Sequence, residues 1–568
     1  MQNQEIAKIF DEVADMIEVS EDNFFRVRAY RNAARTIRDS SKQMADMQPQ
    51  VIQKLPGIGA EISKKIGVIL ATGELPLHRE LQQKVPAGII ALLRVPGLGP
   101  KRARILVEQL KVRDLNDLKK AAQTGAIATI RGFGSKIQDQ ILRSLAQLEQ
   151  RPATRTLFAD AALTVEQLLT HLRNSRGIEH VEPAGSFRRR RETVGDLDLL
   201  AVSSEPAPVM ERLVSFAGVA EVIAKGETKT SVKLNNGLQV DLRVVPRSSY
   251  GAAMVYFTGS QAHCVHLRRV AIKHGLLLNE YGLYRDGVAI AGAEENEVYA
   301  ALGLKWIPPE LREDRGEIEA AEAARLPRLI EREDLRGDLH THTTYTDGRS
   351  SMEQMAKAAR ERGLEYIAIT DHSQRLAMAR GLDPKRLAEQ WREIERVEKK
   401  IGGIRLLRGI EVDILEDGSL DLPDDTLDEL EWVVASVHYK LNQSSAEMTQ
   451  RMITAIRNPR VDVIGHPSGR LLNRREPSEF DLAEVLRVAR EEGCALEINS
   501  QPDRLDLTDG ACLSAKHAGV KLVLSTDSHH TRDFAAVEYG LNQARRGWIE
   551  PDDVLNTRPL KQLRQRRR

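Results

Sequence analysis

Two aspartates separated by one residue follow an arginine-rich turn in the first half of the chain. Asp196 and Asp198 alternate with leucines. Alternate side chains of a strand share a face, so both carboxylates are predicted to point the same way. Divalent cations relieve their mutual repulsion, and Mg²⁺ usually binds one or two carboxylates together with substrate phosphates. Asp241, in a second alternating stretch, is the expected third carboxylate.

The turn before these aspartates is suited to a phosphate, because Gly185 is followed directly by Ser186. Two metal ions on neighbouring carboxylates can clamp the attacking and the leaving oxygen of an in-line displacement. The combination favours nucleotidyl transfer. An Asp-x-Asp pair near a turn is more often a solvated strand end, so the pair alone leaves both interpretations open.

A second set of candidate ligands lies in the last third of the chain, where seven apolar stretches end in histidine, aspartate or glutamate. One histidine at a strand end is usually structural or solvated, but imidazoles and carboxylates that converge from successive strands indicate bound metal. Several ions together can generate hydroxide and neutralise a phosphodiester, so hydrolysis is the expected chemistry. These residues are His340, His342, His372, Glu411, His438, His466, Glu497, Asp527 and His529.

The elements that must position these side chains follow from the intervening sequence. Amphipathic stretches between the apolar segments are long enough for crossover helices, which predicts a closed parallel sheet. In barrels of this kind the chemistry collects at the carboxyl ends of the strands. Imidazole ligands tolerate softer metals than carboxylates do, so the two sites are expected to prefer different ions.

Three segments near the start share an apolar-x-Gly-apolar-Gly core followed by a basic helix. Glycines allow the positive φ of a tight turn, and free N–H groups at the next helix start can bind an anion. One such turn is usually only a turn, but three in register resemble helix-hairpin-helix units, which contact DNA phosphates without base recognition. The expected DNA-contacting glycines are Gly57, Gly59, Gly97, Gly99, Gly132 and Gly134.

Six motifs in the middle of the chain resemble family X DNA polymerases in their order and spacing. They span 185–189, 195–198, 226–229, 240–243, 256–260 and 279–281. The resemblance implies that Asp196, Asp198 and Asp241 are catalytic and hold two Mg²⁺ or Mn²⁺ ions. It implies deoxynucleoside triphosphates and gapped, nicked or primer–template DNA as partners.

The same resemblance assigns the nucleotide pocket and further DNA contacts. Arg243 and Arg268 are the implied additional DNA contacts. Residues 256–260 could otherwise form an ordinary strand that ends in a turn. At Cys264 the family usually has an asparagine, so a minor-groove contact is in question. The implied nucleotide-binding residues are Gly185, Ser186, Arg189, Gly195, Tyr256, Phe257, Gly259 and Cys264.

Lys65 aligns with the family's Schiff-base lysine, which removes a 5′-deoxyribose phosphate. Such a nucleophile is a lysine deprotonated by nearby positive charge. Tyr30 is kept, but Glu61 and Arg26 stand where animal members carry supporting lysines. A phosphate-contacting lysine is therefore at least as good an interpretation.

The C-terminal pattern resembles the polymerase and histidinol phosphatase (PHP) superfamily domain, and no ligand of its motif is lost. In that superfamily the ligands hold up to three ions of Mn²⁺, Zn²⁺ or Fe. The residues carried over are His340, His342, Asp347, His372, Glu411, His438, His466, Asp527 and His529.

Length and composition agree with a multidomain DNA enzyme. A chain of 568 residues is longer than a single hydrophobic core supports, so several domains are expected. The net charge of +1 hides an excess of Lys and Arg in residues 1–150 and of Asp and Glu in 331–568. Phosphate binding depends on the local charge. Three cysteines without pair spacing, no signal peptide and no long apolar run predict a cytoplasmic protein without membrane contact.

The expected architecture is an all-α helix-hairpin-helix region (1–150), an α+β nucleotidyltransferase-type palm (151–245), a thumb (246–315), a linker (316–334) and a distorted (β/α)₇ barrel (335–568). Residues 312–328 are predicted to form a solvated linker helix. The expected function is gap-filling DNA synthesis in repair, with a rear 3′–5′ exonuclease, 3′-end-processing or abasic-site endonuclease activity. The alternatives are a small-phosphate phosphatase tethered to DNA and a non-catalytic end-joining scaffold. The sequence does not show which protein partners the chain has.

Overall fold

The structure is a computed structural model that forms two compact units, residues 1–154 and 155–568. It describes residues 3–20, 24–38, 40, 44–55, 57–72, 74–84, 92, 95, 98, 100–130, 132–134, 137–139, 141–142, 145 and 155–563. Gly97 and Gly99, two of the predicted DNA-contacting glycines, lie outside the described residues.

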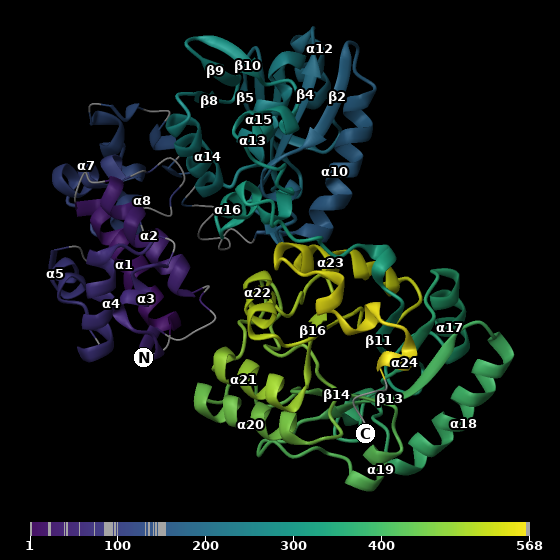
Figure 1. The fold of residues 1–568 in the computed structure, drawn as a ribbon. Helices are drawn as coiled ribbons and strands as arrows, with labels where there is room; N and C mark the ends of the chain where they lie inside the picture. The colour runs from purple at the N-terminus through teal and green to yellow at the C-terminus, as the bar shows by residue number, and fades with distance from the viewer. Residues whose placement is uncertain are drawn as a thin grey trace. The chain divides into compact units, whose positions relative to one another are not determined.

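The first unit is helical in its described residues, as the apolar spacing predicts. Helices α1 and α2 pack against each other through residues such as Ile6, Phe10 and Ile37, which are buried in one apolar core. The helices are α1 (Asn3–Ser20), α2 (Phe24–Arg38), α3 (Pro49–Ile52), α4 (Ala60–Thr72), α5 (Pro76–Lys84), α7 (Pro100–Leu110) and α8 (Leu115–Gln123) (Figure 1).

The palm is a five-stranded mixed sheet in the order β2-β4-β7-β6-β5. Strands β4 and β7 are parallel, and their register places Asp198 opposite Asp241. Leu197, Leu199 and Val240 are buried beneath, so the predicted alternation is confirmed. The elements are α10 (Phe158–Arg173), β2 (Ile178–Pro183), α11 (Gly185–Arg188), β4 (Asp196–Ser203), α12 (Pro206–Val214), β5 (Val219–Lys225), β6 (Lys229–Leu234) and β7 (Gln239–Val245).

The thumb packs two helices against a small antiparallel sheet. Tyr256 and Phe257 lie in the last turn of a helix, so the alternative strand interpretation of residues 256–260 is wrong. Ser260 caps the next helix by accepting a hydrogen bond from the backbone N–H of His263. The elements are α13 (Tyr250–Thr258), α14 (Gln261–Lys273), β8 (Leu277–Asn279), β9 (Gly282–Arg285), β10 (Val288–Ala291) and α15 (Glu295–Ala301).

The solvated helix predicted over residues 312–328 is wrong. Only α16 (Glu317–Glu322) is an α-helix there, and Arg312 and Glu317 are fully buried. Arg312 Nη1 pairs with Glu295 Oε1 at 2.7 Å, and the Glu317 carboxylate lies 2.6 Å from His263 Nδ1. Composition shows that a segment is charged, but it does not reveal partners on distant elements that neutralise the charges inside the protein.

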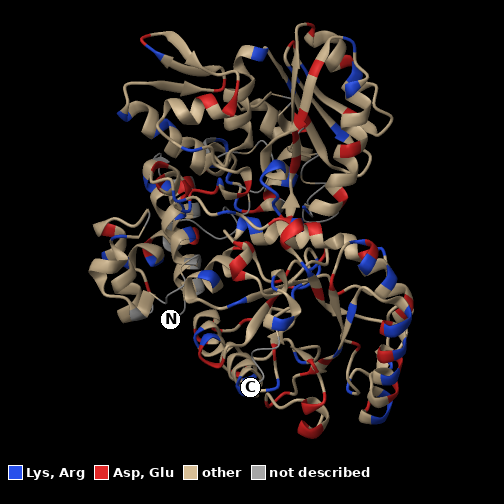
Figure 2. Ribbon diagram, turned by 45° about the vertical axis from the view of Figure 1, so that its right-hand side comes forward, with Lys and Arg blue, Asp and Glu red and all other residues tan. Residues whose placement is uncertain are grey.

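The C-terminal region is the predicted seven-stranded parallel barrel, with strands in sequence order. A bridge between Thr341 and Ser528 brings its first and last strands together. Helices surround the strands, and basic and acidic residues mix along their outer faces (Figures 1 and 2). The strands are β11 (Gly337–Thr341), β12 (Tyr366–Ile369), β13 (Arg405–Asp413), β14 (Trp432–Ser436), β15 (Val463–Ile464), β16 (Ala495–Asn499) and β17 (Leu522–Ser525).

Six longer helices and two short ones accompany these strands. The longer helices are amphipathic, and their apolar sides bury residues such as Met355, Ile394 and Leu486. They are α17 (Met352–Glu361), α18 (Pro384–Ile401), α20 (Ser445–Arg457), α21 (Leu482–Glu492), α22 (Asp509–Ala518) and α23 (Val537–Arg546), with the short α19 (Asp424–Asp428) and α24 (Leu560–Leu563). Among the described residues no helix is long and apolar enough to cross a membrane.

Candidate active sites

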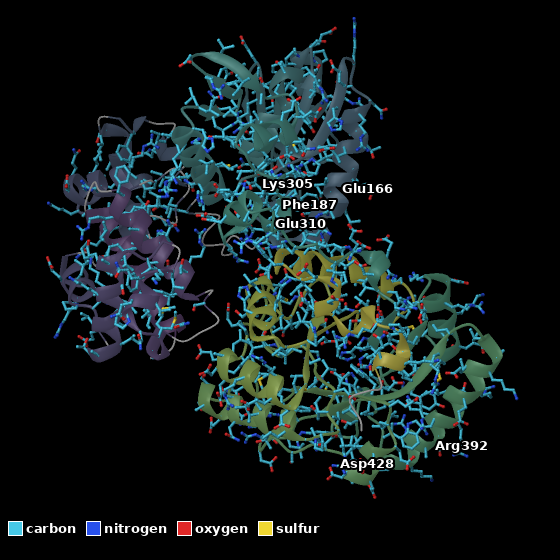
Figure 3. The ribbon with its side chains drawn as sticks, viewed as in Figure 1. Glu166, Phe187, Lys305, Glu310, Arg392 and Asp428 are labelled. Atoms are coloured by element: carbon cyan, nitrogen blue, oxygen red, sulfur yellow. The ribbon has the colours of Figure 1, made fainter. Side chains whose placement is uncertain are left out.

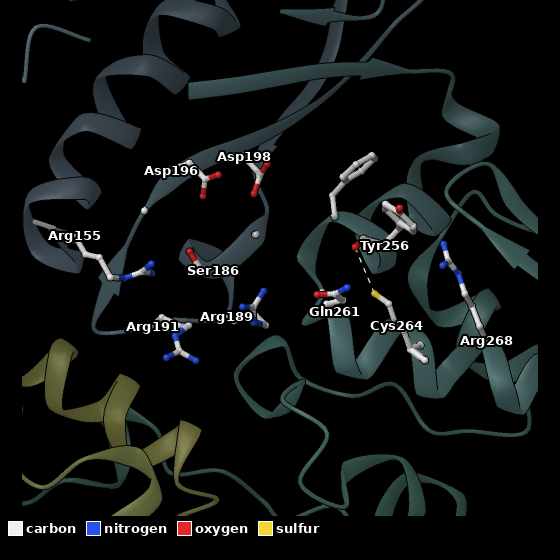
Figure 4. A pocket seen from close by; sticks show the side chains of 15 residues that line it. Arg155, Ser186, Arg189, Arg191, Asp196, Asp198, Tyr256, Gln261, Cys264 and Arg268 are labelled. Atoms are coloured by element: carbon white, nitrogen blue, oxygen red, sulfur yellow. Dashed lines mark hydrogen bonds between the residues drawn. The ribbon is translucent and has the colours of Figure 1, made fainter. Parts of the chain in front are cut away.

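A cleft of about 1000 Å³ opens between the palm and the thumb and brings together most of the predicted polymerase residues (Figure 4). All eight predicted nucleotide-binding residues line it, as do Asp196, Asp198 and Arg268. Asp241 and Arg243 are not among its lining residues. Residues from two separate parts of the sequence therefore form one polar site.

Asp198 is the carboxylate most affected by its surroundings. Burial, followed by the negative charges of Asp196 and Asp241, raises the pKa of Asp198 to about 6. A divalent cation would remove this repulsion, which is the electrostatic requirement of a metal site. The donor set of three neighbouring carboxylates therefore fits hard ions such as Mg²⁺ and Mn²⁺.

Asp241 sits opposite Asp198 but is engaged with its own strand neighbours. Its Oδ2 is 2.8 Å from Lys229 Nζ, and its Oδ1 accepts a hydrogen bond of 2.9 Å from Gln239 Nε2. Burial raises the pKa of Asp241, but the hydrogen bonds from Lys229 and Gln239 outweigh this and lower it overall. The group is thus held as an anion at the edge of the site.

Gly185 is required by close packing on the aspartates. Its φ is +59°, and a Cβ atom there would come within 2.2 Å of Asp198 Oδ2. Any other residue would displace the carboxylate or the turn. The glycine therefore allows the phosphate-sized turn and the metal-binding carboxylate to approach each other.

Arg189 crosses from the palm to the thumb. Its Nε donates to Glu313 Oε1 at 3.0 Å, and its Nη1 donates to the carbonyl of Thr258. These two contacts fix the plane of the guanidinium at the wall of the cleft. Arg155 and Arg191 line the same wall, and sequence reasoning missed both because neither carries a motif of its own.

The aromatic side of the cleft is supported by the two predicted DNA-contacting arginines. The Arg243 guanidinium lies 4.4 Å from the ring centre of Phe257, and that of Arg268 lies 5.1 Å from the ring centre of Tyr256. Stacking of this kind orients both partners. Arg243 therefore contributes to the pocket indirectly, through Phe257.

The barrel brings its predicted ligands together at the carboxyl ends of its strands. Among the described residues, three groups could each hold an ion, with ligand atoms within 4.8 Å of one another. Adjacent groups share His342 or His372, which makes them one continuous cluster. The groups are His342, Asp347, His372 and His529; His340, His342 and Asp527; and His372, Glu411 and His438.

His466 belongs to none of these groups but lies against Glu411, with 2.9 Å between its Nε2 and Glu411 Oε1. Glu411 is also close to the rings of His372 (2.7 Å) and His438 (3.3 Å). This carboxylate therefore occupies the centre of the cluster. All nine carried-over ligand residues lie in or beside it.

Outer hydrogen bonds orient several of the imidazoles. His340 Nδ1 lies 2.7 Å from Glu497 Oε1, and His438 Nδ1 lies 2.9 Å from Asp413 Oδ1. A carboxylate on one ring nitrogen fixes the ring and makes the other nitrogen a better metal ligand. Glu497 ends one of the seven predicted strands, so the strand-end pattern had already included it. Asp413 is the last residue of β13, but it was not among the predicted ligands.

The cluster meets the test for a metal site. His340 Nε2 and both ring nitrogens of His342 are buried without a hydrogen-bond partner among the described residues. Buried polar atoms are rarely left unsatisfied. Cations bound between these ring nitrogens and the neighbouring carboxylates would satisfy them.

The pKa values of two histidines in this cluster are shifted in opposite directions. Burial lowers the pKa of His372, but the charge of Glu411 and the hydrogen bond with Asp347 raise it to about 10. Burial together with the charges of His529 and His372 lowers the pKa of His342 to about 3. Metal binding requires neutral imidazoles, so it should release protons.

The hairpin region has the predicted turn geometry where it is described. Gly57, Gly132 and Gly134 all have positive φ, and Gly57 and Gly59 lie directly before α4. The N-terminus of α4 is therefore open to an anion such as a DNA phosphate.

Lys65, on α4, lacks the electrostatics of a Schiff-base nucleophile. It pairs with Glu61 and lies 5.1 Å from the ring centre of Tyr30. Burial lowers the pKa of Lys65, but the hydrogen bonds with Glu61 and Tyr30 outweigh it and raise the pKa overall. A protonated lysine suits a phosphate contact better than nucleophilic attack.

Replacing Gly57 by valine is expected to weaken DNA binding about tenfold for every sequence, because strain at positive φ disturbs backbone donors that contact phosphates. A Cβ there would also meet Asn32 Cβ at 3.3 Å. Titration of two unrelated gapped duplexes measures the effect. Gly67→Val is the control, since a Cβ at Gly67 meets nothing within 4 Å. A loss confined to one duplex would contradict non-specific phosphate binding.

Comparison with known proteins covers the whole chain. Residues 1–75 match a helix-hairpin-helix domain, 89–147 a SAM-like helix-hairpin-helix tandem, 253–313 the DNA polymerase beta thumb and 338–501 the PHP domain. A protein of Bacillus subtilis (strain 168) named DNA polymerase/3′-5′ exonuclease PolX is 37% identical over 567 residues, 99% of each chain.

Other relatives match a shorter part of the chain. A probable phosphatase of Thermoanaerobacter sp. (strain X514) is 34% identical over 233 residues, 39% of this chain and 89% of that protein. A probable phosphatase of Acetivibrio thermocellus is 31% identical over 201 residues, 34% of this chain and 78% of that protein.

The fold and its two sites define a multidomain enzyme in which a polymerase-type palm and thumb precede a metal-binding barrel. The similarity to the Bacillus protein extends over 99% of both chains, so the family of this enzyme can be stated. The chain belongs to the family X DNA polymerases that carry a C-terminal PHP domain.

Proposed function

We propose that this chain is a DNA-directed DNA polymerase that fills short gaps during DNA repair. Its barrel is a metal-dependent phosphoesterase that acts as a 3′–5′ exonuclease, 3′-end-processing enzyme or abasic-site endonuclease. The cytoplasm is the proposed location, since all three cysteines are free and buried.

One observation carries the proposal for synthesis. A single cleft combines a phosphate-sized glycine turn, a pair of aspartates and an aromatic wall, and Asp241 lies directly across the strand pair from Asp198. These are the groups that a triphosphate, its metal ions and a nucleobase require. The family relationship supports the same assignment.

Each residue has a proposed role in nucleotide addition. Asp196, Asp198 and Asp241 would hold divalent ions, which supply charge neutralisation at the reacting phosphate. Ser186 and Arg189 bind the triphosphate, and the aromatic wall orients the nucleotide. Asp241, held as an anion, favours loss of the proton from the primer 3′-hydroxyl.

The barrel's donor set supports hydrolysis of phosphate esters. Its mixed imidazole and carboxylate groups suit Mn²⁺, Zn²⁺ or Fe, and up to three ions match its three groups. The probable phosphatases among the relatives favour a second candidate, a small-phosphate phosphatase. Release of nucleotides from a labelled primer, compared with release of phosphate from histidinol phosphate, separates the two.

A one-nucleotide-gapped duplex tests the central proposal. The full-length protein is supplied with each deoxynucleoside triphosphate in turn, and with Mg²⁺ or Mn²⁺ separately. Addition of only the templated nucleotide is expected with at least one of the two ions. Absence of extension under all these conditions would overturn the assignment.

Replacing Cys264 by asparagine is expected to tighten nucleotide binding about threefold to tenfold, through roughly one added hydrogen bond. The thiol already has a backbone partner, since Sγ donates to the carbonyl of Tyr256 at 3.4 Å (Figure 4). An amide could instead donate to the minor-groove acceptor of a paired nucleotide. Single-turnover kinetics on the gapped duplex give Kd and the chemical rate separately. Unchanged or weaker binding would refute this role.

A further inference from the structure

The barrel reaches the wall of the polymerase cleft through one buried arginine. Arg546, in the last turn of α23, is 3% exposed. Its Nη1 donates to the backbone carbonyl of Arg189 at 2.7 Å and lies 3.1 Å from Glu313 Oε1. Its Nη2 donates to Asp509 Oδ2 at 2.6 Å. A residue 357 positions after Arg189 thus touches this residue, which is assigned to the triphosphate.

Glu313 connects Arg546 to the side chains that line the cleft. The same carboxylate oxygen that Arg546 contacts also accepts from Arg189 Nε at 3.0 Å and lies 3.6 Å from Arg191 Nη1. Burial opposes ionisation of Glu313, but Arg546 and Arg189 lower its pKa to about 2. Arg546 therefore holds Arg189 both by its backbone and through the carboxylate that orients its guanidinium.

The other end of the same turn is also held by the barrel. Glu192 accepts hydrogen bonds from Arg470 Nη2 at 2.7 Å and from Gln543 Nε2 at 3.2 Å. Arg470 in addition donates to the carbonyls of Arg504 and Leu505, which anchors it within the barrel. Residues 188–192, which we term the arginine turn, are thus held at Arg189 and at Glu192 by side chains of the C-terminal region.

The neighbouring arginine provides a contrast. Arg545 is also on α23 and pairs with Glu310 Oε1 at 2.8 Å, while its Nη1 donates to the carbonyl of Ile330. Glu310, labelled in Figure 3, is not among the residues that line the cleft. Both adjacent arginines of this helix make ion pairs, Arg545 in a more exposed position, and of the two only Arg546 contacts the arginine turn.

We propose that Arg546 is a positioning residue for nucleotide addition: through Glu313 and the Arg189 carbonyl, the barrel sets the arginines that bind the triphosphate. The inference rests on the proposed polymerase function. Under this proposal the barrel supports the structure of the polymerase site and also carries out its own hydrolytic reaction. Binding geometry of this kind affects nucleotide affinity most directly, because a shifted guanidinium loses charge-assisted hydrogen bonds to phosphate.

The test compares Arg546→Met with Arg545→Met in the full-length protein. Single-turnover extension of a one-nucleotide gap gives the nucleotide Kd, and hydrolysis of a labelled primer by the same preparation reports on the barrel. Arg546→Met is expected to raise the nucleotide Kd about tenfold, with hydrolysis unchanged. Arg545→Met should leave the Kd unchanged. Arg546→Lys should give an intermediate Kd, since lysine keeps the charge but not the planar contacts.

Equal losses of affinity in the two methionine variants would overturn the proposal, since they would reflect the interface in general. Loss of a buried charge can destabilise the fold, so Glu192→Gln provides a second route that removes the Arg470 pair. It should raise the nucleotide Kd about threefold, and an unchanged Kd would contradict the role of the barrel. Failure of the wild type to extend any primer would instead refute the proposed function.

Discussion

Replacement of Asp241 by alanine is expected to abolish nucleotide addition and to leave hydrolysis by the barrel intact. The carboxylate lies across the β4–β7 pair from Asp198 and is held as an anion by Lys229. Without it, the site loses a proposed metal ligand and the group proposed to favour deprotonation of the primer hydroxyl. The expected loss is at least about a thousandfold in rate, or about 4 kcal/mol of transition-state stabilisation.

Glu211→Ala is the matched control for this variant. Glu211 is another palm carboxylate paired with a lysine, Lys225, but it is largely exposed and lies outside the cleft. Primer extension and primer hydrolysis are measured on each protein. Extension at the wild-type rate by the Asp241 variant would remove this residue from the catalytic set.

The barrel ligands could be predicted from sequence because their geometry is local to each strand. A parallel barrel places the carboxyl ends of all its strands at one rim, so a residue at the end of an apolar stretch is placed by the fold itself. His340, Glu411 and Asp527 needed no knowledge of pairing beyond this rule, and they lie in the metal-binding groups. The alternation around Asp196 and Asp198 could also be predicted, because it too is local to one strand.

The polar contacts between distant segments could not be predicted in this way. Glu313 belongs to a charged stretch that looks solvated in sequence, yet it is 7% exposed and pairs with arginines of the palm and the barrel. Arg312 is fully buried against Glu295. Such ion pairs depend on which surfaces meet after folding, and the spacing of residues in the sequence does not show which surfaces meet.

The position of Tyr256 and Phe257 illustrates a different limit. Their motif matched the family, but β-prone aromatic residues before a glycine also suit a strand end. The structure places them in helix α13, whose residues are almost all buried between the palm and the thumb. Because α13 is packed on more than one side, its sequence lacks the one-sided apolar pattern that identifies a helix.

Joint replacement of His342 and His438 by alanine is expected to silence hydrolysis and to leave nucleotide addition unchanged. His342 is shared by two of the three candidate metal groups, and His438 belongs to the third, so the double variant removes a ligand from each. Loss of metal should reduce hydrolysis at least about a thousandfold, because the activated water and the charge neutralisation both disappear. The metal content of the purified protein gives a second measure.

His517→Ala is the matched control, since it removes a barrel imidazole that belongs to none of the three groups. It should keep both its metal and its hydrolysis. Because Arg546 and Arg470 contact the arginine turn and belong to none of the three metal groups, an intact fold in the double variant should also preserve the nucleotide Kd. Undiminished phosphodiester cleavage by the double variant would place the nuclease elsewhere. A parallel loss of extension would mean that the cluster also stabilises the barrel's contact with the arginine turn.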